Sequence, residues 1–237
     1  MTDRTPSTEQ IWHAVATERA TLTELLDSLP DSAWDHPSLC AEWRVRDVVA
    51  HLVLSADADI ATILKGLIRA RGKFDRLVRD TAIRHADDRT TARLRTELRA
   101  TIDARSTPLG TTPTDRLMDL LVHGQDIAIP LGIRRQMPVV AARTALDRVW
   151  GTARPFRARE KLVGYRLIAT DCAWAEGEGD RVEGPVDALL LLTTGRQIAL
   201  ERLTGDGAAQ LRAGRVVVSR TKKPHARAHG DIGGKLS

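Results

Sequence analysis

The segment at residues 111–132, TTPTDRLMDLLVHGQDIAIPLG, constrains the fold of this chain more than any other. Apolar residues lie at helical spacing around most of its circumference, and a cap signature with Pro113 opens it. We therefore predict a helix that runs to about Leu131 and terminates at Gly132. A helix with so much apolar surface is stable only when other elements cover it on several sides.

Three more segments show helical periodicity. Residues 8–29, 44–67 and 88–105 each place apolar side chains on one side of a helix. Four such helices joined by loops indicate a helical bundle. After about residue 160 the pattern changes to strand-like alternation, a Gly/Glu turn and a short apolar helix. The sequence therefore predicts an α+β protein, with a bundle over residues 8–155 and a small α/β domain over residues 160–214.

The positive charge of the chain is concentrated in its last residues. The formal net charge is +5, and residues 215–237 hold six Lys or Arg side chains and one Asp, which accounts for the whole excess. Residues 1–214 are therefore close to neutral. We expect a basic, disordered tail and no specific binding of nucleic acid, with weak, unspecific contact to RNA or an anionic surface as the alternative.

Other features of the composition point to a cytoplasmic protein. No apolar run is long enough to span a membrane, and the N-terminal residues MTDRTPSTEQ contain no apolar core of a signal peptide. The two cysteines, Cys40 and Cys172, are too few for a disulfide framework. Cys40 has no obvious base partner in the sequence, so we expect both cysteines to be packing residues.

A narrow line of ionisable side chains interrupts the apolar surface of the helix predicted after Pro113. Asp119 and His123 are four residues apart, so a carboxylate and an imidazole share one helical face. The second helix offers His51 beside its apolar stripe. Two groups from one helix and one from another match the three-ligand pattern of catalytic zinc. The alternatives are a solvated polar face for the first two residues and a hydrogen-bonded core position for His51.

Three motifs carry a resemblance to a known family. They are CAEWRVRDVVAHLVL at residues 40–54, DLLVHGQDIAIPLG at residues 119–132 and GYRLIATDCAWAEGEGDRVEGPVDALLLLTTGR at residues 164–196. In this order they resemble signatures of the mycothiol-dependent maleylpyruvate isomerase family, over about residues 10–213. The resemblance implies a DinB-like four-helix bundle that holds a divalent metal ion, most often zinc, followed by a small α/β C-terminal domain.

The resemblance also assigns roles to single residues. It implies His51, Asp119 and His123 as metal ligands, and Arg196 as a catalytic residue that contacts an anionic substrate. The family commonly has Glu where this chain has Asp119, so the carboxylate reaches about 1.5 Å less far and we expect a shifted backbone or weaker metal binding. It commonly has Trp where this chain has Gln125, so we expect different packing near the site.

From the resemblance we expect an enzyme, either an isomerase or a thiol S-transferase. Its thiol cosubstrate is mycothiol, and a metal-bound thiolate attacks a small electrophile. Asp126 follows His123 by almost one turn and either orients that imidazole or faces solvent. Trp43 either clamps its loop onto the bundle or lines the pocket mouth. The alternative function is a non-catalytic metal-binding or regulatory protein on the same scaffold, and we expect a monomer or a homodimer.

Overall fold

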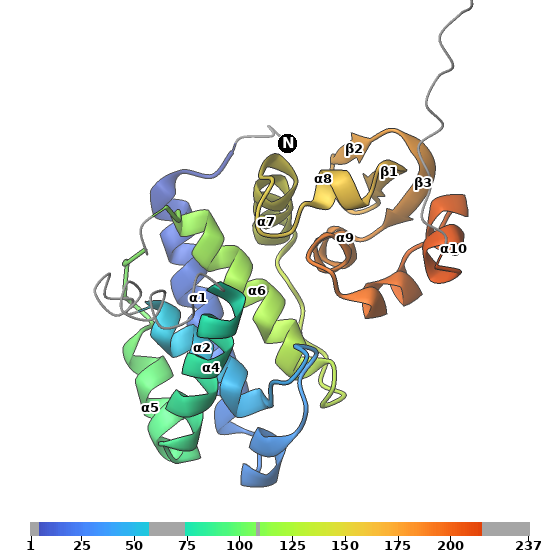
Figure 1. Ribbon diagram of the computed structural model, residues 1–237. Helices are drawn as coiled ribbons and strands as arrows, with labels where there is room; N and C mark the ends of the chain where they lie inside the picture. Colours follow the sequence, from blue (N-terminus) through green and yellow to red (C-terminus); the bar gives the residue numbers. More distant parts are fainter. Residues whose placement is uncertain (1–4, 57–73, 108–109, 215–237) are drawn as a thin grey trace, which may run out of the picture.

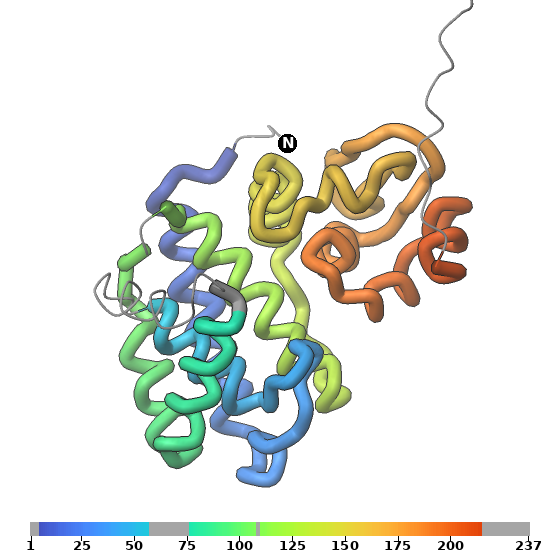
Figure 2. Tube along the Cα trace, viewed as in Figure 1, coloured from blue at the N-terminus to red at the C-terminus, as the bar shows by residue number. Residues whose placement is uncertain are grey.

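The computed structural model describes residues 5–56, 74–107 and 110–214 of the 237. The second half of the helix expected at residues 44–67 and the basic tail at residues 215–237 lie outside the described residues. Figures 1 and 2 show a larger helical part beside a smaller part that contains a sheet. No helix among the described residues is long and apolar enough to cross a membrane.

Four helices of the larger part form a closed ring. They are α1 (Thr8–Asp27), α2 (Val45–Ala56), α5 (Thr91–Ala100) and α6 (Pro113–Ala128). α1 packs on α5 and α6, and α2 packs on the same two helices, so each member touches two others. The apolar stripes read from the sequence supply the core, in which Leu22, Val48 and Leu121 are buried.

Local sequence signals set where these helices begin. The Ser7 hydroxyl accepts from the Gln10 N–H, and the Gln10 side chain accepts from the Ser7 N–H, which forms a capping box before α1. Thr112 and Asp115 form the same arrangement before α6, with Pro113 as the first helical residue. The cap signature in the sequence therefore marks the true start of α6, whereas the helix ends at residue 128 rather than at residue 131.

The structure contains two long helices that the sequence analysis did not predict. α4 (Phe74–Asp87) packs on α2, with Ala86 buried. α7 (Val139–Gly151) packs on α6, with Ala142 and Ala145 buried. Buried alanines carry part of both contacts, and alanine contributes little to the hydrophobic periodicity by which helices are recognised.

The smaller part is built on a three-stranded sheet in the order β2–β1–β3. Its strands are β1 (Gly164–Ala169), β2 (Ala175–Gly177) and β3 (Gly179–Gly184). β1 is central, antiparallel to β2 and parallel to β3. The short helices of this part are α8 (Ala158–Lys161), α9 (Val186–Thr193) and α10 (Asp206–Arg212). Two 3-10 helices are η1 (Asp31–Asp35), before α2, and η2 (Gln197–Arg202), after α9.

α7 connects the two parts because it packs on α6 and on α9 (Figure 1). The predicted fold class is confirmed: a helical bundle is followed by a small α/β unit. The expected boundary between residues 155 and 160 stays a prediction, since α7 has contacts with both parts.

Candidate metal centre

Three side chains from two helices meet at one point of the bundle. His51 projects from α2, and Asp119 and His123 project from successive turns of α6. The His51 Nε2 lies 3.3 Å from one Asp119 oxygen, and the His123 Nε2 lies 3.5 Å from the other. The three side chains are between 13 and 18 % exposed, so this polar line faces the interior and is not the solvated face of α6.

The donor set and its spacing fit a divalent metal ion. Two imidazole nitrogens and a carboxylate are ligands of catalytic zinc sites, which keep one position open. Ligand atoms around tetrahedral zinc lie roughly 3.4 Å apart, given bonds of about 2.05 Å. The contacts of Asp119 with His51 and His123 are close to that spacing. Asp119 therefore reaches both imidazoles despite being shorter than the Glu that the family commonly has.

Asp126 contacts the opposite nitrogen of the His123 ring. The His123 Nδ1 donates to Asp126 Oδ2 over 2.8 Å, and the Asp126 side chain is fully buried. A hydrogen on Nδ1 leaves the lone pair on Nε2, which is the nitrogen near Asp119. Asp126 is therefore not a solvated residue, which was one of the two alternatives in the sequence analysis.

Arg196 ties the smaller part of the molecule to Asp126. Its Nε and Nη2 donate to the two Asp126 oxygens over 2.9 and 2.6 Å. Its Nη1 donates to the carbonyl of Thr194 over 2.7 Å. Because Arg196 follows α9, this ion pair joins the end of α9 to α6. The sequence resemblance assigned Arg196 to an anionic substrate, and in the structure its carboxylate partner is Asp126.

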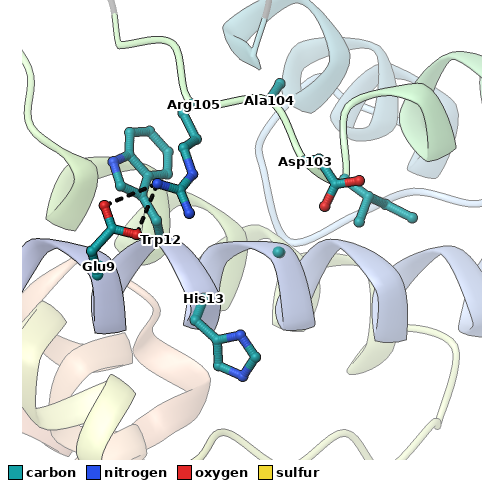
Figure 3. A pocket seen from close by; sticks show the side chains of 8 residues that line it. Glu9, Trp12, His13, Asp103, Ala104 and Arg105 are labelled. Carbon is teal, nitrogen blue, oxygen red and sulfur yellow. Dashed lines mark hydrogen bonds and ion pairs between the residues drawn. The ribbon is translucent and has the colours of Figure 1, made fainter.

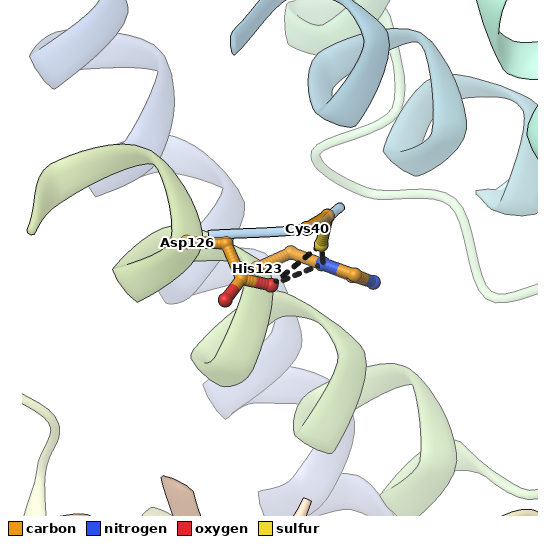
Figure 4. Close-up of side chains that lie close together, drawn as sticks. All are labelled: Cys40, His123 and Asp126. Atoms are coloured by element: carbon orange, nitrogen blue, oxygen red, sulfur yellow. Dashed lines mark hydrogen bonds and ion pairs between the residues drawn. The ribbon is translucent and has the colours of Figure 1, made fainter. Parts of the chain in front are cut away.

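The loop before α2 adds two residues that the sequence analysis did not place among the ligands. The Cys40 Sγ lies 3.1 Å from Asp126 Oδ2 and 3.6 Å from His123 Nδ1 (Figure 4). The Trp43 ring lies 5.3 Å from the His51 ring and 6.0 Å from the His123 ring, centre to centre. No local pattern could have linked Cys40 to partners 83 and 86 residues away.

Cys40, His123 and Asp126 form a second group of metal-type ligands around the same histidine. This group fits a metal ion poorly, because Asp126 is already paired with the Arg196 guanidinium through both oxygens. A cation there would have to displace that guanidinium and the hydrogen on His123 Nδ1. The group formed by residues 51, 119 and 123 is therefore the candidate metal centre.

Neighbouring charges control the protonation of the candidate metal centre. Burial raises the pKa of Asp119. The charges of His51 and His123 lower the same pKa by a larger amount, so its net shift is downward. Burial lowers the pKa of His123, but hydrogen bonds to Asp126 and Cys40 outweigh this effect and raise the pKa to about 10. Without a metal ion the site therefore holds an imidazolium between two carboxylates, and a metal ion has to displace its proton.

Gln125 stands where the family resemblance expects Trp. Its side chain is buried and donates to the carbonyl of Arg135 over 2.8 Å. It therefore holds the segment after α6 and has no hydrogen bond to the metal-type ligands. The difference in packing that we expected from Gln125 in place of Trp therefore lies at its contact with the Arg135 carbonyl.

A separate cavity of about 380 Å³ lies between α1 and the segment after α5 (Figure 3). Arg105 pairs with Glu9 there, and Trp12 and His13 also line the cavity. None of the three side chains of the candidate metal centre lines it, so this cavity is not part of the candidate site.

Comparison with known proteins places the bundle in a family. The family model described as the mycothiol maleylpyruvate isomerase N-terminal domain matches residues 15–128, from within α1 to the end of α6. The bundle belongs to this family. The matched mycothiol maleylpyruvate isomerase domain includes His51, Asp119 and His123 and ends before Arg196. The resemblance carried by the sequence motifs is thereby confirmed.

Two solved structures share the fold. The crystal structure of the mycothiol-dependent maleylpyruvate isomerase has a TM-score of 0.58 and 14 % sequence identity, and the match covers 86 % of this chain and 94 % of that chain. A histidine-to-alanine mutant of the mycothiol-dependent maleylpyruvate isomerase has a TM-score of 0.60, with the same identity and coverage. At this identity the likeness shows the fold, which extends beyond the N-terminal domain. No curated protein sequence matches the chain significantly.

Proposed function

We propose that this chain is a metal-dependent enzyme that uses a low-molecular-weight thiol, mycothiol, to isomerise or conjugate a small electrophile. The meeting of His51, Asp119 and His123 at one point of the bundle carries this proposal. The family of the bundle and the solved neighbours, which are named for a mycothiol-dependent maleylpyruvate isomerase, support the thiol and the reaction class.

Each of the polar residues has a distinct part in this proposal. His51 and His123 would hold the metal ion through Nε2, and Asp119 would hold it through a carboxylate oxygen. A bound zinc ion supplies the positive charge that keeps a thiol deprotonated at the open position. Asp126 retains the proton on His123 Nδ1, so that Nε2 remains available. The low exposure of the site limits the water around the reacting sulfur.

The electrophile decides which product forms. Addition of the thiolate sulfur to an activated double bond turns that double bond into a single bond. The thiol adduct can rotate about this single bond. Elimination of the thiol then completes a cis–trans isomerisation and regenerates the thiol. Displacement of a leaving group by the same sulfur gives a thioether and consumes the thiol. We assign Arg196, which is 15 % exposed at the junction of the two parts, to an anionic group of the electrophile.

A non-catalytic metal-binding or regulatory protein on the same scaffold is the second candidate function. The pairing of Arg196 with buried Asp126 favours it, because a guanidinium that is already paired has fewer donors left for a substrate carboxylate. Cytoplasmic localisation, a monomeric or homodimeric state and the lack of a nucleic-acid partner remain predictions from the sequence.

Metal content and thiol turnover of the purified chain test the proposal. We expect about one zinc ion per chain by elemental mass spectrometry. Mycothiol should react with maleylpyruvate or with a chloronitrobenzene only when zinc is present, and a chelator should abolish the reaction. A zinc-loaded protein that turns over neither electrophile would support the non-catalytic alternative. A chain that binds no zinc after reconstitution would contradict both functions.

Zinc affinity is expected to rise with pH. The pKa of His123 is raised from 6.5 to about 10 without metal, so zinc binding at neutral pH displaces one proton from this ring. The apparent association constant should therefore rise about tenfold per pH unit below the raised pKa and level off above it. By the same linkage, the metal-free fold is stabilised by this proton at neutral pH and loses that stabilisation as the pH rises toward 10.

Competition with a chromophoric chelator between about pH 6.5 and 8.5 measures this dependence, after correction for titration of the chelator itself. A flat profile over that range would show that His123 is already neutral in the metal-free protein.

A further inference from the structure

Arg116 places a buried guanidinium next to the candidate metal centre. It lies on α6, three residues before Asp119, and its Nη1 is 3.7 Å from Asp119 Oδ2. The same Nη1 donates to the carbonyl of Ser55 over 3.1 Å, and Ser55 follows His51 by four residues on α2. Arg116 is only 8 % exposed. The two helices that carry the candidate ligands therefore also hold this guanidinium, about one turn away from the ligands.

Among the described residues, one edge of the Arg116 guanidinium has no partner. Its Nε is buried without a hydrogen-bond acceptor, and its Nη2 donates to no described residue. Nε and Nη2 form an edge that binds a carboxylate through two parallel hydrogen bonds. Arg196 binds Asp126 with this edge, and Arg148 binds Asp115 with it. Arg116 therefore lacks the carboxylate that two other arginines of the molecule hold in the same way.

A second buried guanidinium adds to the positive charge at this point. Arg19 on α1 is buried, and its Nη1 donates to the carbonyls of Thr101 and Ala104, with no carboxylate of the described residues paired to it. Burial and the charge of Arg116 lower the pKa of Arg19 to about 10, so the two groups are near enough to repel each other. A metal ion bound to Asp119 would also share the one negative charge near Arg116. An anion at the free edge of Arg116 would balance this charge.

We propose that Arg116 binds a carboxylate of the electrophile through Nε and Nη2, and that it makes the metal centre selective for anionic over neutral electrophiles. The geometry of Arg116 carries the anion site, and only the assignment to the electrophile rests on the proposed function. This site is separate from Arg196, whose corresponding edge is occupied by Asp126. The contact with Ser55 already orients the Arg116 guanidinium, which lowers the entropy lost on binding.

Binding of maleate to the full chain tests the anion site without a thiol and without turnover. Maleamide, the neutral diamide of the same shape, is the matched probe. We expect the wild type to bind maleate at least about tenfold more tightly than maleamide by isothermal titration calorimetry. Zinc-loaded and metal-free protein are both measured, so that a carboxylate bound to Arg116 is distinguished from one bound to the metal ion.

Three variants assign the binding to one side chain. Arg116→Gln keeps an N–H for the Ser55 carbonyl but removes the charge, so maleate affinity should fall at least about tenfold in both metal states. Arg116→Lys keeps the charge without the two-donor edge, so its affinity should lie between those of the wild type and Arg116→Gln. Arg105→Gln removes the same charge from an exposed arginine that pairs with Glu9, so it should bind maleate like the wild type.

Thermal unfolding separates a binding role of Arg116 from a structural one. Without ligand or metal, Arg116→Gln should unfold at the same temperature as the wild type or a higher one, because it removes one of two neighbouring buried positive charges. Saturating maleate should raise the unfolding temperature of the wild type and not that of the variant. A lower unfolding temperature with unchanged maleate affinity would mean that Arg116 only supports the fold.

Further results would overturn the anion site or separate it from the proposed function. Equal maleate affinity of the wild type and Arg116→Gln, or no maleate binding by the wild type in either metal state, would overturn it. If Arg116→Gln does not fold, unchanged affinity of Arg116→Lys would contradict two-donor binding and a loss would support it. Maleate binding that depends on Arg116, in a chain that binds no zinc and turns over no electrophile, would support the anion site and contradict the proposed function.

Discussion

Removal of either histidine from the candidate metal centre is expected to abolish stoichiometric zinc binding. His51→Ala and His123→Ala each remove one of the two imidazole ligands, and Asp119→Ala removes the carboxylate. Loss of a direct ligand should weaken zinc affinity by more than about 100-fold, which exceeds the effect of losing an outer hydrogen-bond partner. Chelator competition with the purified variants measures the affinity, and circular dichroism shows whether each variant is folded.

Two control variants separate the loss of a ligand from general damage. His13→Ala removes an exposed histidine of α1 that is not part of the ligand group, so zinc affinity should not change. Asp119→Glu retains a carboxylate and introduces the residue that the family commonly has, so it should bind zinc as well as the wild type or better. If all three alanine variants bind zinc like the wild type, the metal site lies elsewhere in the chain.

The three candidate ligands could be found from the sequence because most of their geometry is local. Asp119 and His123 share a face through helical spacing alone, and the start of their helix is marked by Pro113. His51 required only a second helix whose inner face was indicated by Val48. The structure brings these three residues together, and the metal that they would hold stays a prediction.

The contacts around the ligands could not be predicted, because they join distant parts of the chain. Asp126 meets Arg196 at a separation of 70 residues and Cys40 at a separation of 86 residues. Within α6 alone, a buried Asp126 cannot be distinguished from a solvated one at the end of an amphipathic helix. The partners depend on how α9 docks through α7, and α7 itself was not recognised in the sequence.

Asp126→Ala is expected to affect both stability and metal binding. The substitution leaves the Arg196 guanidinium without its carboxylate and the His123 Nδ1 without its acceptor. Removal of one partner of a buried ion pair destabilises proteins by about 3 to 5 kcal/mol, and loss of an outer partner lowers metal affinity about 10- to 100-fold. Urea unfolding of the metal-free protein measures the first effect, and chelator competition measures the second.

The double variant Asp126→Ala with Arg196→Ala separates the two roles of this carboxylate. No charge is left buried without a partner, so the free energy of unfolding should recover by about 1 kcal/mol or more relative to Asp126→Ala alone. Zinc affinity should not recover, because the His123 Nδ1 still has no acceptor. Recovery of both quantities would mean that Asp126 only balances Arg196 and does not orient His123. Recovery of neither would mean that the unpaired guanidinium is not the source of the instability, which would then come from the loss of the contact between α6 and the segment after α9.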